Sequence, residues 1–139
     1  MAISRILAID YGEKRIGLAI SDPLQIISRP YLVLENQVGS ILEDIVKIIQ
    51  KENVGKIVLG LPVNLAGDDT RKTAEVKEFA NKLSSVISIP LEFWDERYTT
   101  VEANKMIKEM KIDSQKARKI VDKIAASIML QDYLENQKK

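Results

Sequence analysis

The chain has 139 residues, neither Cys nor His, and a formal net charge of +1. This length suits one domain, so we expect residues 1–139 to fold as a single unit. Without Cys or His there can be no disulfide, serine triad, imidazole base or ordinary zinc site. Any catalysis must therefore use carboxylates, Lys, Arg, hydroxyls, backbone amides or metal ions.

Short apolar runs that end in turn residues predict five strands, at 6–9, 15–20, 29–34, 56–60 and 91–94. Apolar residues at helical spacing predict four helices, at 39–52, 70–85, 101–110 and 117–135. The order βββαβαβαα makes the opening hairpins antiparallel and the strands reached through helical crossovers parallel. We therefore expect an α/β fold with helices on the faces of a five-stranded mixed sheet.

No apolar run reaches the roughly 18 residues that span a bilayer. The apolar stretch at the N-terminus is too short for a signal peptide. We therefore expect a cytoplasmic protein with no membrane partner.

Acidic residues follow two of the predicted strands. The first strand ends at Asp10, and Asp95 and Glu96 follow the fifth. Ligands of open α/β sheets gather at the carboxyl ends of strands, and a carboxylate that is partly desolvated there needs a partner such as Mg²⁺. A salt bridge from Asp10 to Lys14 or Arg15 is the alternative explanation for this acid.

A third acid, Asp122, falls within the last predicted helix beside apolar neighbours. Ala125 and Ala126 would let this part of the helix approach the sheet closely. Helical spacing alone favours an exposed acid that pairs with Lys119 or Lys123.

Two regions could contact phosphate groups. The loop from Gly60 to Gly67 precedes a helix N-terminus, which favours anions, although it lacks the ending of a Walker motif. Arg71 and Lys72 add positive charge to the first turn of that helix. The stretch 105–123 carries seven bases against three acids, but charge alone favours a solvated helix surface over phosphate contact.

Four segments in order resemble the YqgF family, the Holliday-junction-resolvase-like proteins associated with pre-16S rRNA processing. They are residues 10–19, Gly60–Leu61–Pro62 with Gly67, Asp95–Glu96–Arg97 with Thr99–Thr100, and Asp122 with Ala125–Ala126 and residues 128–131. The resemblance implies an RNase H-like fold and a metal-dependent endonuclease that hydrolyses phosphodiesters of structured nucleic acid. The implied process is 5′-end processing of pre-16S rRNA during ribosome biogenesis, with a Holliday-junction DNA resolvase as the alternative.

The same resemblance implies roles for individual residues. Asp10, Glu96 and Asp122 would be catalytic and would hold Mg²⁺ or Mn²⁺, two ions with substrate bound, with Asp95 as a further metal ligand. The residues expected to bind substrate are Lys14, Arg15, Gly60, Asn64, Gly67, Arg71, Arg97 and Thr99. The expected partners are precursor rRNA or branched DNA and ribosomal precursor particles, bound by a monomer or weak homodimer.

The position of Glu96 departs from the general RNase H-like pattern, in which the second acid ends the fourth strand. Here the fourth strand ends in Gly60–Leu61–Pro62, and the fifth strand lies roughly 10 Å from the first. Glu96 must therefore reach inward from its loop, or bind metal only after substrate arrives.

Two other functions stay open at this point. A non-catalytic RNA-binding assembly factor would explain the basic stretch and the displaced Glu96. An ATPase of the actin and sugar-kinase superfamily would explain Asp10–Tyr11–Gly12, but the chain is short for the two lobes that close on ATP.

Overall fold

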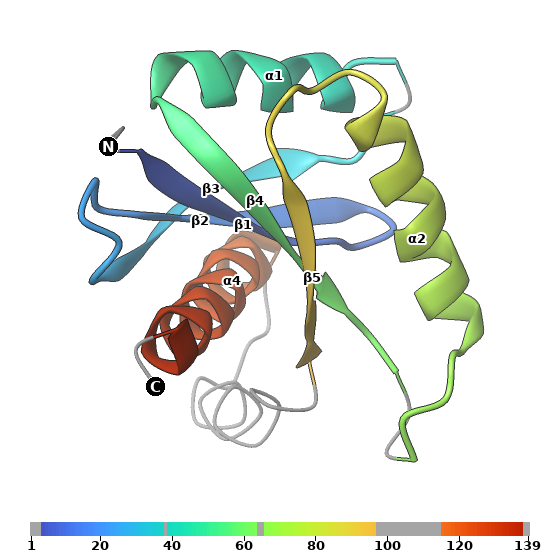
Figure 1. The fold of residues 1–139 in the computed structure, drawn as a ribbon. Helices are drawn as coiled ribbons and strands as arrows, with labels where there is room; N and C mark the ends of the chain where they lie inside the picture. Colours follow the sequence, from blue (N-terminus) through green and yellow to red (C-terminus); the bar gives the residue numbers. More distant parts are fainter. Residues whose placement is uncertain (1–3, 38, 64–65, 97–114, 138–139) are drawn as a thin grey trace.

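The computed structural model describes residues 4–37, 39–63, 66–96 and 115–137, without the side chains of 115–118 (Figure 1). Five strands form one sheet: β1 (Arg5–Asp10), β2 (Arg15–Ser21), β3 (Ser28–Glu35), β4 (Val54–Leu61) and β5 (Leu91–Asp95). Their order across the sheet is β3-β2-β1-β4-β5. The β1–β2 and β2–β3 pairs are antiparallel, and the β1–β4 and β4–β5 pairs are parallel. The predicted mixed sheet is confirmed.

Three helices cover the sheet: α1 (Ile41–Lys51), α2 (Arg71–Ser84) and α4 (Gln115–Gln137). Helices α1 and α2 lie on one face and α4 lies on the other (Figure 1). The helix predicted at 101–110 lies outside the described residues. None of the described helices is long and apolar enough to cross a membrane.

The core is divided into two layers because successive side chains of a strand point to opposite faces. Leu7 and Ile9 of β1 pack under α1 and α2, whereas Ile6 and Ala8 pack against α4. Continuing this alternation, Asp10 belongs to the α4 face and Tyr11 to the α1–α2 face, where it packs against the core. The end of β1 therefore presents consecutive residues to both sides of the sheet.

The N-terminus of α2 is held by a capping box. The Thr70 side chain accepts a hydrogen bond from the Thr73 backbone N–H, and the Thr73 side chain accepts one from the Thr70 N–H. The buried Thr73 hydroxyl also donates to the Pro62 carbonyl oxygen. This contact ties the first turn of α2, with Arg71 and Lys72, to the loop after β4.

A single carboxylate organises the loop between β2 and β3. The Asp22 side chain accepts hydrogen bonds from the backbone N–H groups of Leu24 (3.1 Å), Ile26 (2.8 Å) and Ile27 (2.7 Å). Hydrogen bonds from the backbone, that of Ile27 first, lower the pKa of Asp22. The ionised carboxylate is therefore the form that the folded loop prefers.

We predict that Asp22→Ala lowers the free energy of unfolding by about 1–2 kcal/mol at pH 7, because three hydrogen bonds to an exposed carboxylate are lost. An acid whose pKa is lower in the folded protein stabilises the folded state at pH values above its unfolded-state pKa of about 4. This stabilisation is lost as the pH falls through the pKa of the folded state. Urea unfolding at pH 7 and pH 2.5 measures both effects. Asp22→Asn, which keeps a neutral acceptor, should lose less; an equal loss at both pH values would contradict the argument.

Candidate active site

The Asp10 carboxyl lies at the carboxyl end of β1, on the face covered by α4. The residue keeps some exposed surface, but protein atoms surround its carboxyl group. Burial raises the pKa of Asp10 well above its ordinary value, and the charge of Glu96 and a hydrogen bond with its side chain raise it further. Two buried carboxyl groups this close disfavour the state in which both are ionised unless a cation lies beside them.

Glu96 reaches this position by crossing over Gly60. A Cβ atom at residue 60 would lie 2.5 Å from Glu96 Oε1 and 2.8 Å from Met129 Sδ. The missing side chain on β4 therefore leaves the space in which Glu96 extends from the end of β5 toward Asp10. Of the two routes left open by the sequence, the structure has the inward reach of Glu96.

Asp122 faces the sheet and not the solvent. Its Oδ2 atom lies 2.8 Å from Nε of Arg15 on β2, and both side chains are largely covered, with 28% and 21% exposed. The expected pairing with Lys119 or Lys123 is wrong for Lys119, which pairs with Glu35. The alternative salt bridge from Arg15 to Asp10 is replaced by the Arg15–Asp122 pair. The charge of Asp122 also raises the pKa of Asp10, after the larger effects of burial and Glu96.

Gly17 makes the docking of α4 possible. A Cβ at this position of β2 would collide with the backbone carbonyl group of Asp122. The backbones of β2 and α4 thus approach each other directly, next to fully buried Ala126. Sequence analysis missed this glycine because a strand glycine in a single sequence gives no sign of what approaches it.

Lys72 is the cation that acts on the acid pair. Its charge lowers the pKa of Asp10, opposing burial and Glu96. The Thr70–Thr73 box and the Thr73–Pro62 contact fix the first turn of α2 that carries it. Together with exposed Arg71, Lys72 places positive charge beside the site, so anionic substrate would be attracted there.

The remaining predicted residues fall into three groups. Lys14 is exposed in the β1–β2 turn, and Gly67 lies in an exposed loop with a φ of +88°. Asp95 lies four residues after Leu91 on β5, so strand alternation puts both side chains on the same face of the sheet. Leu91 packs against the core under α1 and α2, and Asp95 therefore belongs to the face opposite Asp10. Asn64, Arg97 and Thr99 lie outside the described residues.

The donor chemistry of the site fits a hard divalent cation only in part. Among residues 4–37, 39–63, 66–96 and 115–137, no three His, Cys, Asp or Glu residues lie close enough together to hold a metal ion. Asp10 and Glu96 nevertheless form a desolvated pair of oxygen ligands, and Mg²⁺ is usually held by one or two carboxylates with substrate phosphate. Asp122, held by Arg15, is near enough for its charge to act on Asp10 but does not complete a group of three ligands.

The sheet order and the acids at the strand ends define a RuvC-like RNase H fold. A structure of T. thermophilus RuvC in complex with a Holliday junction substrate has a TM-score of 0.58 at 10% identity, over 97% of this chain and 96% of that one. At this identity the likeness shows the fold alone.

Sequence comparison identifies the family. The family model described as "RuvX: Holliday junction resolvase" matches residues 4–136. A "Putative pre-16S rRNA nuclease" of Maridesulfovibrio salexigens is 40% identical over 94% of this chain and 97% of its own. A protein of the same name from Dictyoglomus thermophilum is 44% identical over 95% and 96%. The chain belongs to the RuvX family of nucleases, which confirms the resemblance to YqgF proteins.

The two glycines should respond differently to substitution. We predict that Gly60→Ala keeps the fold, because Glu96 and Met129 contact it through the ends of flexible side chains, but lowers Mn²⁺ affinity about 10-fold or more by displacing Glu96. Gly17→Ala should instead cost roughly 1–3 kcal/mol of stability, because the backbone of α4 must move. Thermal unfolding and calorimetric Mn²⁺ titration of both variants separate these effects. Unchanged Mn²⁺ affinity in Gly60→Ala would remove Glu96 from the ligand set.

The acid pair should destabilise the metal-free protein. An acid whose folded pKa is raised loses stability as pH rises from its unfolded value of about 4 through the folded pKa. We predict that Asp10→Asn raises the Tm by about 3 °C or more at pH 7 in chelator, and that the gain disappears near pH 4. Asp44→Asn on α1 is the control for loss of an acid elsewhere. A lower Tm at pH 7 would show that the two carboxyls are not in conflict.

Proposed function

We propose that this protein is a metal-dependent endonuclease that hydrolyses phosphodiester bonds of structured nucleic acid, with precursor 16S rRNA in the cytoplasm as its substrate. The observation that carries the proposal is the contact between the Asp10 and Glu96 carboxyls over Gly60, at the carboxyl ends of the strands. The names of the relatives support RNA as substrate, and the description of the family keeps a branched DNA as the alternative.

The acids would hold Mg²⁺ or Mn²⁺, both of which suit carboxylate sites. Nucleases of this family typically use divalent metals. A bound ion lowers the pKa of the attacking water and stabilises the charge that develops on the phosphoryl oxygens. Asp10 and Glu96 would supply the first ligands, and Asp122 would join them from α4 to complete a site for two ions. Asp95 is a less favourable candidate ligand, because strand alternation places its side chain on the face of the sheet opposite Asp10.

The basic residues would bind the substrate phosphates. The Arg15 guanidinium holds Asp122 at 2.8 Å and has further N–H groups that can donate to a phosphate oxygen. Lys72 and Arg71 would draw the chain of phosphates toward Asp10. Lys14 and the loop around Gly60 and Gly67 are proposed contacts on either side, together with Asn64, Arg97 and Thr99.

The inward reach of Glu96 favours catalysis over a purely binding role, since a displaced Glu96 was one of the two observations behind that alternative. A monomer or weak homodimer that acts on ribosomal precursor particles is part of the same proposal.

We predict that Asp10→Asn and Glu96→Gln each lower the rate of cleavage at least about 100-fold. Loss of a residue that only supports a metal ligand typically lowers activity about 10- to 100-fold, and loss of the ligand itself should cost no less. The test uses end-labelled precursor 16S rRNA fragments and a four-way DNA junction, with Mg²⁺, Mn²⁺ or chelator. Glu43→Gln on α1 is the matched control and should cleave normally. Binding of RNA should survive in both site variants.

Metal-dependent cleavage that is lost in the variants supports the nuclease, and the preferred substrate decides between RNA and DNA. Full activity of Asp10→Asn, or binding without cleavage by the wild type under any divalent ion, would contradict the proposal. The second result would favour an assembly factor.

A further inference from the structure

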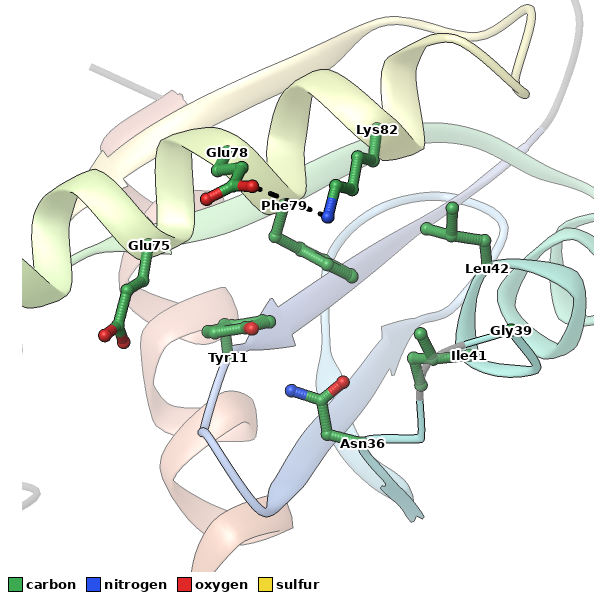
Figure 2. Close-up of a pocket in the computed structure, with 9 residues that line it drawn as sticks. All are labelled: Tyr11, Asn36, Gly39, Ile41, Leu42, Glu75, Glu78, Phe79 and Lys82. Atoms are coloured by element: carbon green, nitrogen blue, oxygen red, sulfur yellow. Dashed lines mark ion pairs between the residues drawn. The ribbon is translucent and has the colours of Figure 1, made fainter.

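A cavity of about 210 Å³ lies beside the site but on the other face of the sheet (Figure 2). It is bounded by the beginning of α1, the middle of α2 and the turn after β1. Sites for drug-sized ligands measure roughly 300–1,000 Å³. The cavity therefore suits a single planar ring system and not a larger ligand.

Two aromatic rings form one wall of the cavity. Phe79 points from α2 toward Tyr11, and their ring centroids lie 4.7 Å apart with an angle of 38° between the planes (Figure 2). Ile41 and Leu42 of α1 form the opposite side. Flat apolar and aromatic walls are the surfaces on which unstacked nucleobases pack.

The polar groups of the cavity are mostly hydrogen-bond acceptors. The Asn36 side-chain nitrogen donates to the Gly12 carbonyl at 2.8 Å, which leaves its oxygen to accept. Glu75 and Glu78 contribute carboxylates whose charges are balanced by Arg71 at 3.8 Å and Lys82 at 3.5 Å. A carboxylate has about four acceptor positions, so one salt bridge leaves others available. Such a rim favours a base that presents an amino group.

A groove next to this cavity carries the two basic residues at the start of α2. It measures about 520 Å³, and Glu13, Arg71 and Lys72 line it together with Tyr11 and Glu75, which also line the cavity. Tyr11 follows Asp10 directly in the chain. Arg71 and Lys72 line the groove beside the cavity, and the charge of Lys72 also acts on Asp10. The phosphate of a neighbouring nucleotide would be attracted there.

We infer that the cavity between Tyr11, Phe79 and Leu42 binds one unpaired nucleobase of the substrate strand, adjacent to the phosphate that is cleaved. This inference rests on the proposed nuclease function. The acceptor-rich rim favours adenine, cytosine or guanine, whose amino groups donate two hydrogens, over uracil, whose ring offers a single donor at N3. Sequence preference at one position near the cut would then come from the face of the sheet opposite the metal site.

The first test removes the base. Substrates carry an abasic nucleotide, one position at a time, within three nucleotides of the cut. At one position the abasic substrate should lose about 10-fold in kcat/KM, the typical effect of one base stacked on an aromatic side chain. Uracil there should lose a similar factor, and Glu75→Gln, whose amide also donates, should reduce the difference between adenine and uracil.

The second test fills the cavity. Leu42→Trp should lower kcat/KM about 10-fold for the normal substrate and leave the abasic substrate unaffected, because the two changes remove the same contact. Leu24→Trp, at an exposed leucine of the β2–β3 loop, is the matched control and should cleave normally. Cleavage that tolerates every abasic position and Leu42→Trp would overturn the inference while the nuclease function stands.

A binding measurement keeps the inference testable if no cleavage is found. RNA that carries 2-aminopurine at each position in turn is titrated into the Asp10→Asn variant, because this measurement needs binding and no cleavage. Fluorescence at one position should fall on binding as the base stacks, and this change should be absent in Asp10→Asn combined with Leu42→Trp. Unchanged fluorescence at every position would overturn the inference. Binding of a free nucleoside monophosphate in the cavity, with no fluorescence change in any RNA, would also overturn it and would assign the cavity to a small molecule.

Discussion

The contact between the Asp10 and Glu96 carboxyls is the constraint on which the site depends. Two acids in a desolvated position repel each other unless a proton or a cation lies between them. Asp10 is fixed at the end of a buried strand, and Glu96 extends over Gly60 from the end of β5, so neither can relax far into water. The fold therefore holds a local electrostatic cost that a divalent ion would remove. Lys72 offsets this cost only in part, since the pKa of Asp10 stays raised.

The third acid depends on a separate part of the fold. Asp122 and Arg15 are 107 residues apart, and their ion pair forms only when α4 is docked on the sheet. Gly17 and Ala126 allow this docking by leaving no side chain, or a small one, in the contact. The docking of α4 thus brings Asp122 to the face of the sheet to which Asp10 belongs. A change that lifts α4 would remove Asp122 from the site while β1 and β4 keep their positions.

The sequence predicts the strands and helices well, because each is marked by a pattern among residues that are close together in the chain. Continuous apolar runs such as 6–9 and 56–60 mark buried strands, and helical spacing marks α1 and α2. The relation between the acids is not local. Alternation puts Glu96 in phase with Trp94, but one sequence does not tell which face of the sheet this is. Nor does it tell that Gly60 leaves space for a side chain from the next strand. Spacing within the last helix favoured Lys119 or Lys123 as the partner of Asp122, because it cannot see Arg15 across the sheet.

The alternation of side chains along β1 explains how chemistry and recognition can be separated in so small a protein. Asp10 belongs to the α4 face with the other acids, and Tyr11 belongs to the face where it meets Phe79. A nucleic-acid strand bound as we infer would cross this edge of the sheet and meet both faces. Substitutions around the cavity can therefore change which base is preferred without moving Asp10 or Glu96. The placement of Glu96 in turn depends on the space over Gly60, which is not among the residues that line the cavity.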